Sequence, residues 1–238
     1  MDLKETEILG NTIDKHWYYR SKAAAMLRLL RDCEPNTILD VGAGSGFFSR
    51  HLLTHTDAHE AWCVDISYQS ESDAAEAGKA IHYRRSIDKL PADVVLLMDV
   101  LQHVDSDSGL LADYAARVPA GAQFLISVPA FQFMWSAHDE FLEHKRRYTL
   151  SGLADMVERS GLRVSRRAYY FGLVFPIAMA MRLATRRLGA GMQPAQSQLK
   201  KHSPITNGFL TAVCMAELPL LAVNHLAGLT AFCLAERP

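Results

Sequence analysis

The chain has 238 residues, with 25 basic and 26 acidic side chains and a formal net charge of −1. This length suits one domain with an elaboration. The near-neutral balance gives no electrostatic reason to expect a nucleic-acid partner, because phosphate binding relies on an excess of Lys and Arg. The four cysteines lack C-x-x-C spacing, which predicts buried thiols in a reducing compartment. The charged N-terminus leads into no apolar signal core, so we expect a cytoplasmic location.

Residues 14–32 are predicted to form a helix that begins at Asp14, a suitable N-cap. Ala23–Leu30 supply its apolar face, and a basic face is formed by Arg20, Lys22, Arg28 and Arg31. The first turns are unusually aromatic. These rings either anchor the helix across the core or form a lid over a ligand, in which case Arg20 is a candidate partner for the ligand's carboxylate. We therefore predict an N-terminal helical lid over residues 1–35.

A glycine-rich loop is the strongest motif in the chain. An apolar run ends in Asp40, three glycines follow at alternate positions from Gly42 to Gly46, and apolar residues then resume to about Leu53. This pattern predicts a strand, a tight loop and a helix, in which glycine lets a ligand approach the backbone. A dinucleotide-binding loop requires glycine at the position of Phe47, and no Lys-Ser/Thr pair follows, which excludes a P-loop.

The next strand candidate, Ala61–Asp65, ends in a carboxylate well placed to accept hydrogen bonds from two vicinal ribose hydroxyls. Together with the Asp-x-Gly-x-Gly-x-Gly loop, it resembles the class I S-adenosylmethionine-dependent methyltransferases. The resemblance implies that the glycine loop holds the methionine part of the cofactor, S-adenosyl-L-methionine, and that Asp65 holds its ribose. The candidate cofactor-binding residues of these two strands are Asp40, Gly42, Ala43, Gly44, Gly46, Asp65 and Ile66.

Residues after this strand are expected to add one helix and one strand. The polar, alanine-rich segment from Ser70 to Ala80 predicts a short outer helix, and Ile81–Arg84 is a candidate third strand. Asp88 follows in a loop where members of the family often touch the adenine. The resemblance therefore adds Asp88 to the cofactor-binding candidates.

Residues 92–104 are the second strong landmark. Their continuous apolar run suits a central parallel strand buried on both faces, and Asp99 marks its exit. Ligands in open α/β sheets bind at such carboxyl ends. The resemblance implies that Met98, Asp99 and Val100 line the cofactor, whereas His103 is interpreted as a structural histidine at a helix start.

A helix over Asp107–Arg117 and a buried strand over Gln123–Pro129 continue the pattern. The alternation of strands and helices now covers five strands. Alternation of this kind predicts a doubly wound parallel sheet with helices on both faces.

The rest of the expected fold follows from the resemblance, which implies an α/β, Rossmann-like, doubly wound sheet of seven strands. After a helix over Leu150–Ser160, the sixth strand, Leu162–Tyr170, should form an antiparallel hairpin with the seventh, Gly228–Glu236. We accordingly place the cofactor-binding core at residues 36–171 and its final strand at 228–238.

A long, aromatic and histidine-rich loop, residues 129–149, leaves a strand at the ligand-binding edge, where such a loop is favoured to be functional. It resembles a bacterial branch of the family in which Trp-x-x-His-Asp and His-x-Arg-Arg-Tyr segments recur. In one interpretation, His138 or His144 removes a proton from an acceptor hydroxyl during methyl transfer, because imidazole titrates near neutral pH. Tyr148 and Arg147 would then orient the acceptor.

Two other interpretations of this loop stay open. His138, Asp139 and His144 could bind a metal, but they lack a strong ligand spacing and the fold needs no metal, so we expect none. Alternatively, Asp139, Arg146 and Arg147 form ion pairs and caps that hold the loop closed over the active site. Methyl transfer itself demands little of side chains, because the sulfonium is an activated donor and alignment supplies much of the acceleration.

Residues 172–227 are predicted to be a helical insertion between the last two strands, with apolar helices near Leu173–Leu188 and Phe209–Leu226. The first is too short to span a bilayer and the second is interrupted by polar residues, so we predict no transmembrane hairpin. The insertion is either an interfacial patch whose basic residues face anionic head groups, or an apolar lid or homodimer contact.

These inferences predict a methyltransferase that acts on a small-molecule or lipid-like acceptor, mainly at oxygen, with carbon or nitrogen as further options. Proximity and orientation would supply most of the rate, with a histidine as general base. The main alternative is a catalytically silent accessory protein that binds S-adenosyl-L-methionine. A nicotinamide oxidoreductase is disfavoured by the glycine spacing.

Overall fold

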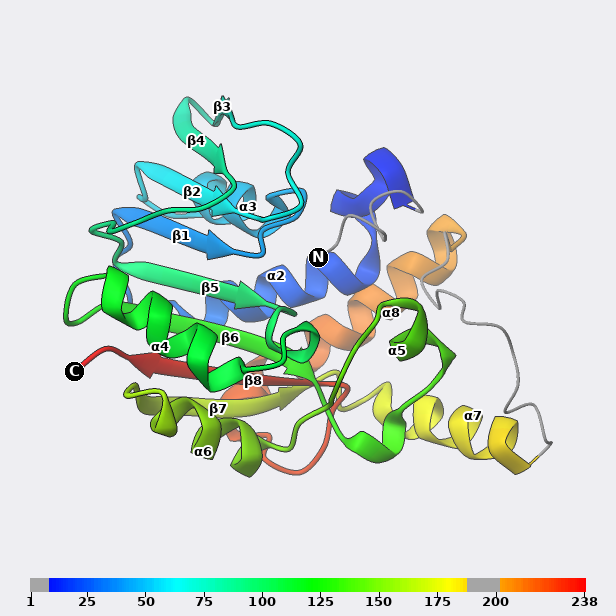
Figure 1. Ribbon diagram of the computed structural model, residues 1–238. Coiled ribbons are helices and arrows are strands. Elements are labelled where there is room, and N and C mark those ends of the chain that lie inside the picture. The colour runs from blue at the N-terminus through cyan, green and yellow to red at the C-terminus, as the bar shows by residue number, and fades with distance from the viewer. Residues whose placement is uncertain (1–8, 188–201) are drawn as a thin grey trace.

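The computed structural model describes residues 9–187 and 202–238 and contains an eight-stranded sheet with helices on both faces (Figure 1). The strand order is β3-β4-β2-β1-β5-β6-β8-β7. The strands are β1 (Thr37–Val41), β2 (Glu60–Val64), β3 (Ser72–Glu76), β4 (Lys79–Arg84), β5 (Val94–Met98), β6 (Gln123–Pro129), β7 (Arg163–Tyr170) and β8 (Thr230–Glu236). The α-helices are α2 (Trp17–Leu29), α3 (Phe47–His55), α4 (Asp107–Arg117), α5 (Ala137–Phe141), α6 (Leu150–Arg159), α7 (Phe175–Arg187) and α8 (Pro204–Glu217). The 3-10 helices are η1 (Gly10–Lys15), η2 (Leu101–His103), η3 (Gln132–Met134) and η4 (Leu218–Val223).

The sheet confirms the doubly wound α/β prediction. Strands β4, β2, β1, β5 and β6 pair in parallel, whereas β8 pairs antiparallel with both β6 and β7. Every residue of the central strands β1 and β5 is buried, as continuous apolar runs require when helices cover both faces. The parallel strands thus direct their carboxyl ends to one edge, where ligands bind in folds of this kind.

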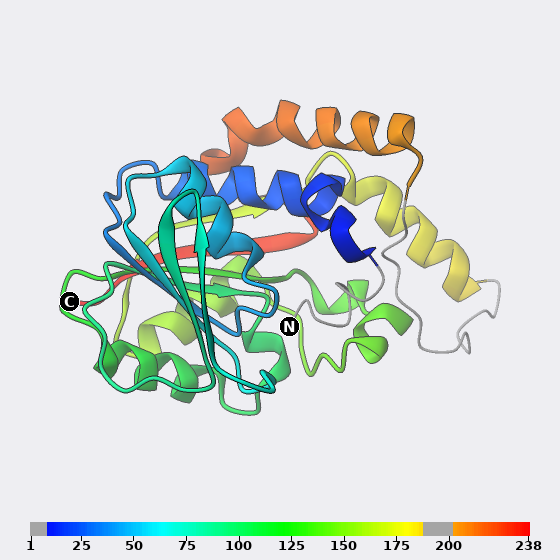
Figure 2. The same cartoon turned by 90° about the horizontal axis from the view of Figure 1, so that it is seen from above.

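Each face of the sheet has its own hydrophobic core. On one face, α2 and α3 cover the strands, and residues such as Met26 and Leu52 pack into the first core. On the other, α4 and α6 contribute Leu111 and Leu153 to the second. Figure 2 shows α8 running along the outer side of α2, and Cys214 of α8 belongs to the first core. The N-terminal helix is therefore packed between the sheet and the insertion.

The region after β2 differs from the prediction. Residues 72–76 form the edge strand β3, which pairs antiparallel with β4, where the sequence suggested an outer helix. The connection passes through Ala77 (φ 52°) and Gly78 (φ 78°). Two consecutive residues with positive φ form the tight turn that matches the twist of a hairpin. The sheet consequently has one strand more than the seven expected.

The N-terminal helix begins at Trp17 after a 3-10 turn, and its cap is His16 rather than Asp14, because the His16 Nδ1 atom accepts a hydrogen bond from the Tyr18 N–H (3.4 Å). Aromatic rings fix this helix in place. The Tyr18 ring stacks on Phe171, with centroids 5.2 Å apart, and Tyr19 meets Phe47 of α3 at 5.4 Å. The aromatic cluster therefore anchors the helix across the core, as one of the two sequence interpretations held.

The insertion lies between β7 and β8 and is held at both ends of its second helix. Near the start of α8, Asn207 accepts a hydrogen bond from the Trp17 N–H (2.8 Å) and donates one to the Lys15 carbonyl (2.7 Å). At its end, the buried Glu217 carboxylate accepts hydrogen bonds from the N–H groups of Gly172 (3.1 Å) and Leu173 (2.7 Å). The helix is thereby joined to α2 and to the chain that leaves β7.

Candidate active site

The glycine loop joins β1 to α3 and brings its backbone close to the end of β5. Gly42, Gly44 and Gly46 all have positive φ, of 64°, 53° and 71°. A Cβ atom on Gly42 would lie 2.8 Å from a methyl group of Val100, and one on Gly46 would lie 2.9 Å from the Tyr83 hydroxyl. Only glycine satisfies both the backbone angle and the close approach at these two positions.

The predicted carboxylates Asp40 and Asp65 flank this loop. Asp40 is buried at the end of β1 and accepts a hydrogen bond from the Ser49 hydroxyl of α3 (2.8 Å). Asp65 follows β2 and accepts hydrogen bonds from the N–H groups of Gly44 (3.0 Å) and Ser67 (2.9 Å) and from the Ser67 hydroxyl. Burial raises the pKa of Asp65, but these hydrogen bonds outweigh it and hold the pKa below its usual value. Asp65 is thus an ionised acceptor at the rim of the loop, next to the exposed side chain of Ile66.

Asp99 follows β5 and forms an ion pair with Lys22, a fully buried side chain of α2. The Lys22 Nζ atom also donates a hydrogen bond to the Tyr18 hydroxyl (3.2 Å). The sequence placed Lys22 on a basic face of the helix and gave no sign of this pairing. Met98 and Val100, on either side of Asp99, are buried, so this short segment presents only Asp99 to its surroundings.

Three non-glycine residues with positive φ follow strands at this same edge. Asp99 follows β5 (φ 59°), Phe131 follows β6 (φ 58°) and Phe171 follows β7 (φ 64°). Such conformations cost free energy for L residues, and they persist where the surrounding structure holds them. Phe131 stacks on Tyr169 at 4.8 Å and Phe171 is completely buried, so packing holds both turns in place.

A cavity of about 260 Å³ lies beside the Lys22–Asp99 pair, between the ends of β5 and β6 and the helices α2, α5 and α7. Its surface is mainly apolar and includes Trp17, Met134 and Leu229. Its histidine and arginine side chains are His16, His103, His138, His144, His202, Arg147 and Arg182. The aromatic start of α2 therefore also forms a wall of the cavity, whereas the predicted lid over a bound ligand stays a prediction.

Asp139 organises one wall of the cavity. It is fully buried at the start of α5, where it forms a capping box with Ser136. Its carboxylate accepts hydrogen bonds from His144 Nδ1 (2.9 Å) and from Arg147 Nε (2.7 Å) and Nη2 (3.0 Å). Burial raises the pKa of Asp139, but the hydrogen bonds from His144 and Arg147 dominate and hold it well below its usual range. The ionised carboxylate accepts a hydrogen bond from a proton-bearing Nδ1 of His144 and so fixes the orientation of the ring.

Two further histidines in the wall are neutral at physiological pH. Burial lowers the pKa of His138 to about 4, and it lowers the pKa of His103 to about 4 as well. The His103 ring meets the His144 ring edge to face at 4.8 Å, and its Nε2 atom is buried without a hydrogen-bond partner among the residues that the structure describes. His103, interpreted from sequence as structural, is therefore part of the cavity wall.

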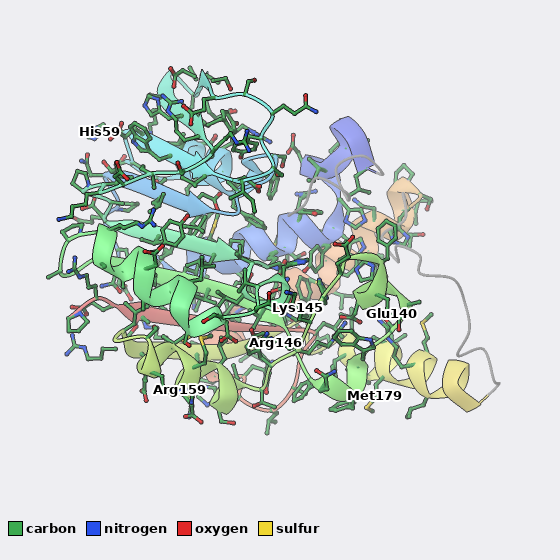
Figure 3. All side chains as sticks on the ribbon, in the orientation of Figure 1. His59, Glu140, Lys145, Arg146, Arg159 and Met179 are labelled. Carbon is green, nitrogen blue, oxygen red and sulfur yellow. The ribbon has the colours of Figure 1, made fainter. Side chains whose placement is uncertain are left out.

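The predicted catalytic residue Tyr148 has a different position. Its hydroxyl donates hydrogen bonds to the Leu101 carbonyl (3.2 Å) and to Asp107 (2.9 Å), and the residue does not line the cavity. Burial and the hydrogen bond to Asp107 raise its pKa. Figure 3 shows the neighbouring Lys145 and Arg146, which pair with Asp105 and Asp107. These ion pairs attach the loop to the segment after β5, as the ion-pair interpretation predicted. His144, in the same loop, lines the cavity.

Three remaining predictions concern Arg20, Asp88 and a metal. Arg20 is exposed on α2 and does not line the cavity, and its predicted contact with the cofactor carboxylate stays a prediction. The buried cation of this helix is Lys22, which pairs with Asp99. Asp88 is exposed in the loop after β4. Among residues 9–187 and 202–238, no group of three His, Cys, Asp or Glu side chains is arranged to hold a metal ion.

The comparisons with known proteins agree with this geometry. A family model described as a methyltransferase domain matches residues 15–166, more than half of the chain. A comparison with curated proteins finds none that matches. Among solved structures, the chain is similar to one from a Haloferax volcanii complex of a methyltransferase activator and a methyltransferase, with 17% identity, a TM-score of 0.58, and 99% of this chain and 92% of that chain covered.

Two other solved structures share the fold at similar levels. A Haemonchus contortus phosphoethanolamine N-methyltransferase in complex with S-adenosyl-L-methionine has 15% identity and a TM-score of 0.53, with 90% of this chain and 52% of that chain covered. The mitomycin 7-O-methyltransferase has 14% identity and a TM-score of 0.51, with 92% and 54% covered. The chain thus spans about half the length of these two. It belongs to the class I S-adenosylmethionine-dependent methyltransferases and is an enzyme that takes S-adenosyl-L-methionine as its cofactor.

Proposed function

We propose that this enzyme transfers a methyl group to a hydroxyl oxygen of an apolar small-molecule or lipid-like acceptor, with His144 as the general base. The observation that carries the proposal is the buried Asp139–His144 pair, whose imidazole lines a mainly apolar cavity beside Asp99. The mitomycin 7-O-methyltransferase, which shares the fold, acts on oxygen by its name and supports this choice by analogy.

The residues at the carboxyl edge of the sheet fit the cofactor. The glycine loop offers backbone without side chains, Asp65 supplies an ionised carboxylate for the ribose hydroxyls, and exposed Ile66 supplies an apolar surface beside it. We place Asp99 between the cofactor site and the acceptor cavity, because the next residue, Val100, lies against Gly42 and Asp99 itself lines the cavity. The bound cofactor supplies a methyl group on an activated sulfonium, so the protein chiefly has to align the acceptor.

The acceptor cavity matches an apolar molecule with a hydroxyl group. Trp17, Met134 and Leu229 provide apolar surface, while His144 and Asp99 bring polar groups to the same cavity. A few polar groups in an apolar pocket fix the orientation of a bound molecule. The cavity is thus suited to hold an acceptor hydroxyl near the imidazole of His144.

His144 is better suited than His138 to remove the proton. The Asp139 carboxylate holds the Nδ1 proton of His144, so Nε2 would take the hydroxyl proton as the acceptor oxygen displaces a neutral thioether from the methyl carbon, the electron pair of the broken carbon–sulfur bond staying on sulfur. The adjacent carboxylate would stabilise the resulting imidazolium. With a pKa of about 4, the His138 imidazole holds a proton only weakly at neutral pH. We therefore infer that His138 shapes the cavity and takes no part in proton transfer.

Replacing Asp65 with alanine is expected to weaken binding of S-adenosyl-L-methionine about ten- to a hundredfold, because hydrogen bonds to a charged acceptor contribute roughly 1.5–3 kcal/mol. Titration calorimetry with the cofactor measures this change. Ser67→Ala is the matched control, since it removes one donor to Asp65 and leaves the carboxylate in place, and its affinity should stay within about threefold. Equal affinities for wild type and Asp65→Ala would contradict the ribose assignment.

The proposed reaction is tested by incubating the enzyme with methyl-labelled S-adenosyl-L-methionine and extracts of the source cell, separated into lipid and aqueous fractions. We expect label in an organic-soluble product whose methyl group NMR assigns to oxygen. Label on nitrogen or carbon would overturn the hydroxyl assignment. Label only in a polar product would overturn the apolar acceptor, and label in neither fraction would favour a silent binding protein.

A further inference from the structure

The outer faces of α7, α8 and η4 are apolar to a degree found nowhere else in the described chain. Of eleven large apolar side chains that are exposed among residues 9–187 and 202–238, nine lie within residues 173–226. Examples are Ile177 and Met181 on α7, Ile205 and Phe209 on α8, and Leu220 and Val223 on η4, whose exposed fractions range from 63% to 86%. Exposed helix faces of globular proteins normally carry charged residues, so this surface needs a partner.

The charges of these helices favour an anionic partner. The last turns of α7 contain Arg182, Arg186 and Arg187 and no acidic residue. The only acidic residue of α8 and η4 is Glu217, which is buried against the start of the insertion. Two copies of such a surface repel each other through their like charges, whereas an anionic lipid surface attracts it.

One of these helices also has the composition of a membrane segment. Contrary to the expectation from its polar residues, Pro204–Val223 is long and apolar enough to cross a bilayer by length and composition, with a mean hydropathy of 1.4. Its inner side, however, is attached to the domain through Asn207, Cys214 and Glu217. Asn207 bonds to α2, the Cys214 carbonyl accepts a hydrogen bond from Tyr170 of β7, and Glu217 binds the chain that leaves β7. The helix is therefore placed to lie along a membrane surface with its outer face in the lipid.

The same helices lead to the acceptor cavity. Ala178 and Arg182 of α7 line it, and so does His202, two residues before the start of α8. Figure 1 shows α7 and the start of α8 at the end of the molecule toward which β1 and β5 point, and Figure 3 shows Met179 of α7 and Glu140 of α5 at this end. When these helices lie on a lipid surface, the opening of the cavity consequently lies next to the lipid.

We infer that the outer faces of α7, α8 and η4 bind the surface of an anionic lipid membrane, from which the acceptor enters the cavity. The apolar side chains insert among the acyl chains near the head groups, and the basic end of α7 lies against anionic head groups. The membrane contact stands on its own observations, whereas the entry of the acceptor rests on the proposed function.

Co-sedimentation with lipid vesicles tests this inference. Phosphatidylcholine vesicles with and without phosphatidylglycerol are mixed with wild-type enzyme and with the double variant Ile177→Glu, Ile205→Glu. Both positions lie in the first turn of their helices, where glutamate is compatible with the helix dipole, so the fold should survive. We expect wild type to bind the anionic vesicles and the variant to bind at least about tenfold more weakly, because a charged residue opposes burial in the interface.

The matched control is Ala112→Glu, Ser151→Glu, which adds the same charge to exposed positions of α4 and α6 on the other face of the sheet. It should bind like wild type. Absence of wild-type binding to anionic vesicles, or equal binding by the first variant, would overturn the inference. Sedimentation velocity that shows a wild-type dimer dissociated by the first variant would assign the surface to a second copy instead. Methyl transfer by all three proteins to the organic-soluble acceptor, assayed without vesicles, tests the proposed function separately, because a protein that transfers no methyl group can still bind vesicles.

Discussion

Replacing His144 with alanine is expected to slow methyl transfer by about 10²–10⁴-fold at saturating cofactor, the usual effect of removing a general base. The imidazole is positioned by Asp139 and faces the cavity, so its loss removes the group that accepts the hydroxyl proton. The affinity for S-adenosyl-L-methionine should stay within about twofold, because His144 lies outside the glycine loop and far along the chain from Asp65. Initial rates with the labelled cofactor measure the effect.

Two controls separate a base from a residue that only supports the loop. His138→Ala removes a neighbouring imidazole of low pKa from the same cavity and should cost less than about tenfold in rate. Added imidazole should partly restore activity to His144→Ala, since the deleted ring leaves room in a cavity of about 260 Å³. A rate loss that imidazole cannot restore, or an equal loss in His138→Ala, would count against His144 as the base.

Replacing Asp139 with asparagine is expected to lower the free energy of unfolding by about 3–5 kcal/mol, the range for breaking a buried ion pair on one side. The carboxylate is completely buried and binds His144, Arg147 and Ser136, so an amide leaves the Arg147 charge without its partner. Urea unfolding measures the change. Asp113→Asn is the matched control, because its pair with Arg117 is on the surface and should contribute less than about 1 kcal/mol. A loss below about 1 kcal/mol for Asp139→Asn would contradict the structural role.

The pH dependence of stability follows from the same carboxylate. The folded pKa of Asp139 lies below its unfolded value of about 4, so its contribution is complete above that value and is lost as the pH falls toward the folded pKa. Wild-type stability should therefore fall as the pH decreases below about 4. In Asp139→Asn this part of the decrease should be missing.

The parts of the fold that depend on local pattern were predictable. The glycine loop, the apolar runs of β1 and β5, and the helix over Asp107–Arg117 are all encoded in neighbouring residues, and the structure has them at the predicted positions. The strand at residues 72–76 was not predictable, because alanine favours a helix locally, whereas the turn at Ala77–Gly78 and the pairing with β4 favour a strand. Tertiary pairing prevailed over local preference there.

In the site, too, some residues can be predicted from their local sequence and others only from tertiary contacts. Asp65 and Asp99 end strands, which their positions in the sequence reveal, and the Ser136-x-x-Asp139 spacing is that of a capping box. Lys22 could not be assigned, because its partner Asp99 lies 77 positions further along the chain and a single buried cation leaves no periodic signal. His103 likewise acquires its place only when the loop carrying His144 folds back onto η2.

The position of β8 has a consequence for how the chain folds. This strand pairs with β6 on one side and β7 on the other, and β6 and β7 are not neighbours. During synthesis β6 and β7 therefore remain without β8, because β8 is synthesised only after the whole insertion. Contacts between residues this distant in sequence form slowly. The cofactor half, built from β1, β2, β4 and β5, has all its strands much earlier. We expect a folding intermediate in which that half is formed and the edge of β6 is still open, and it is this species that a chaperone would have to protect from aggregation.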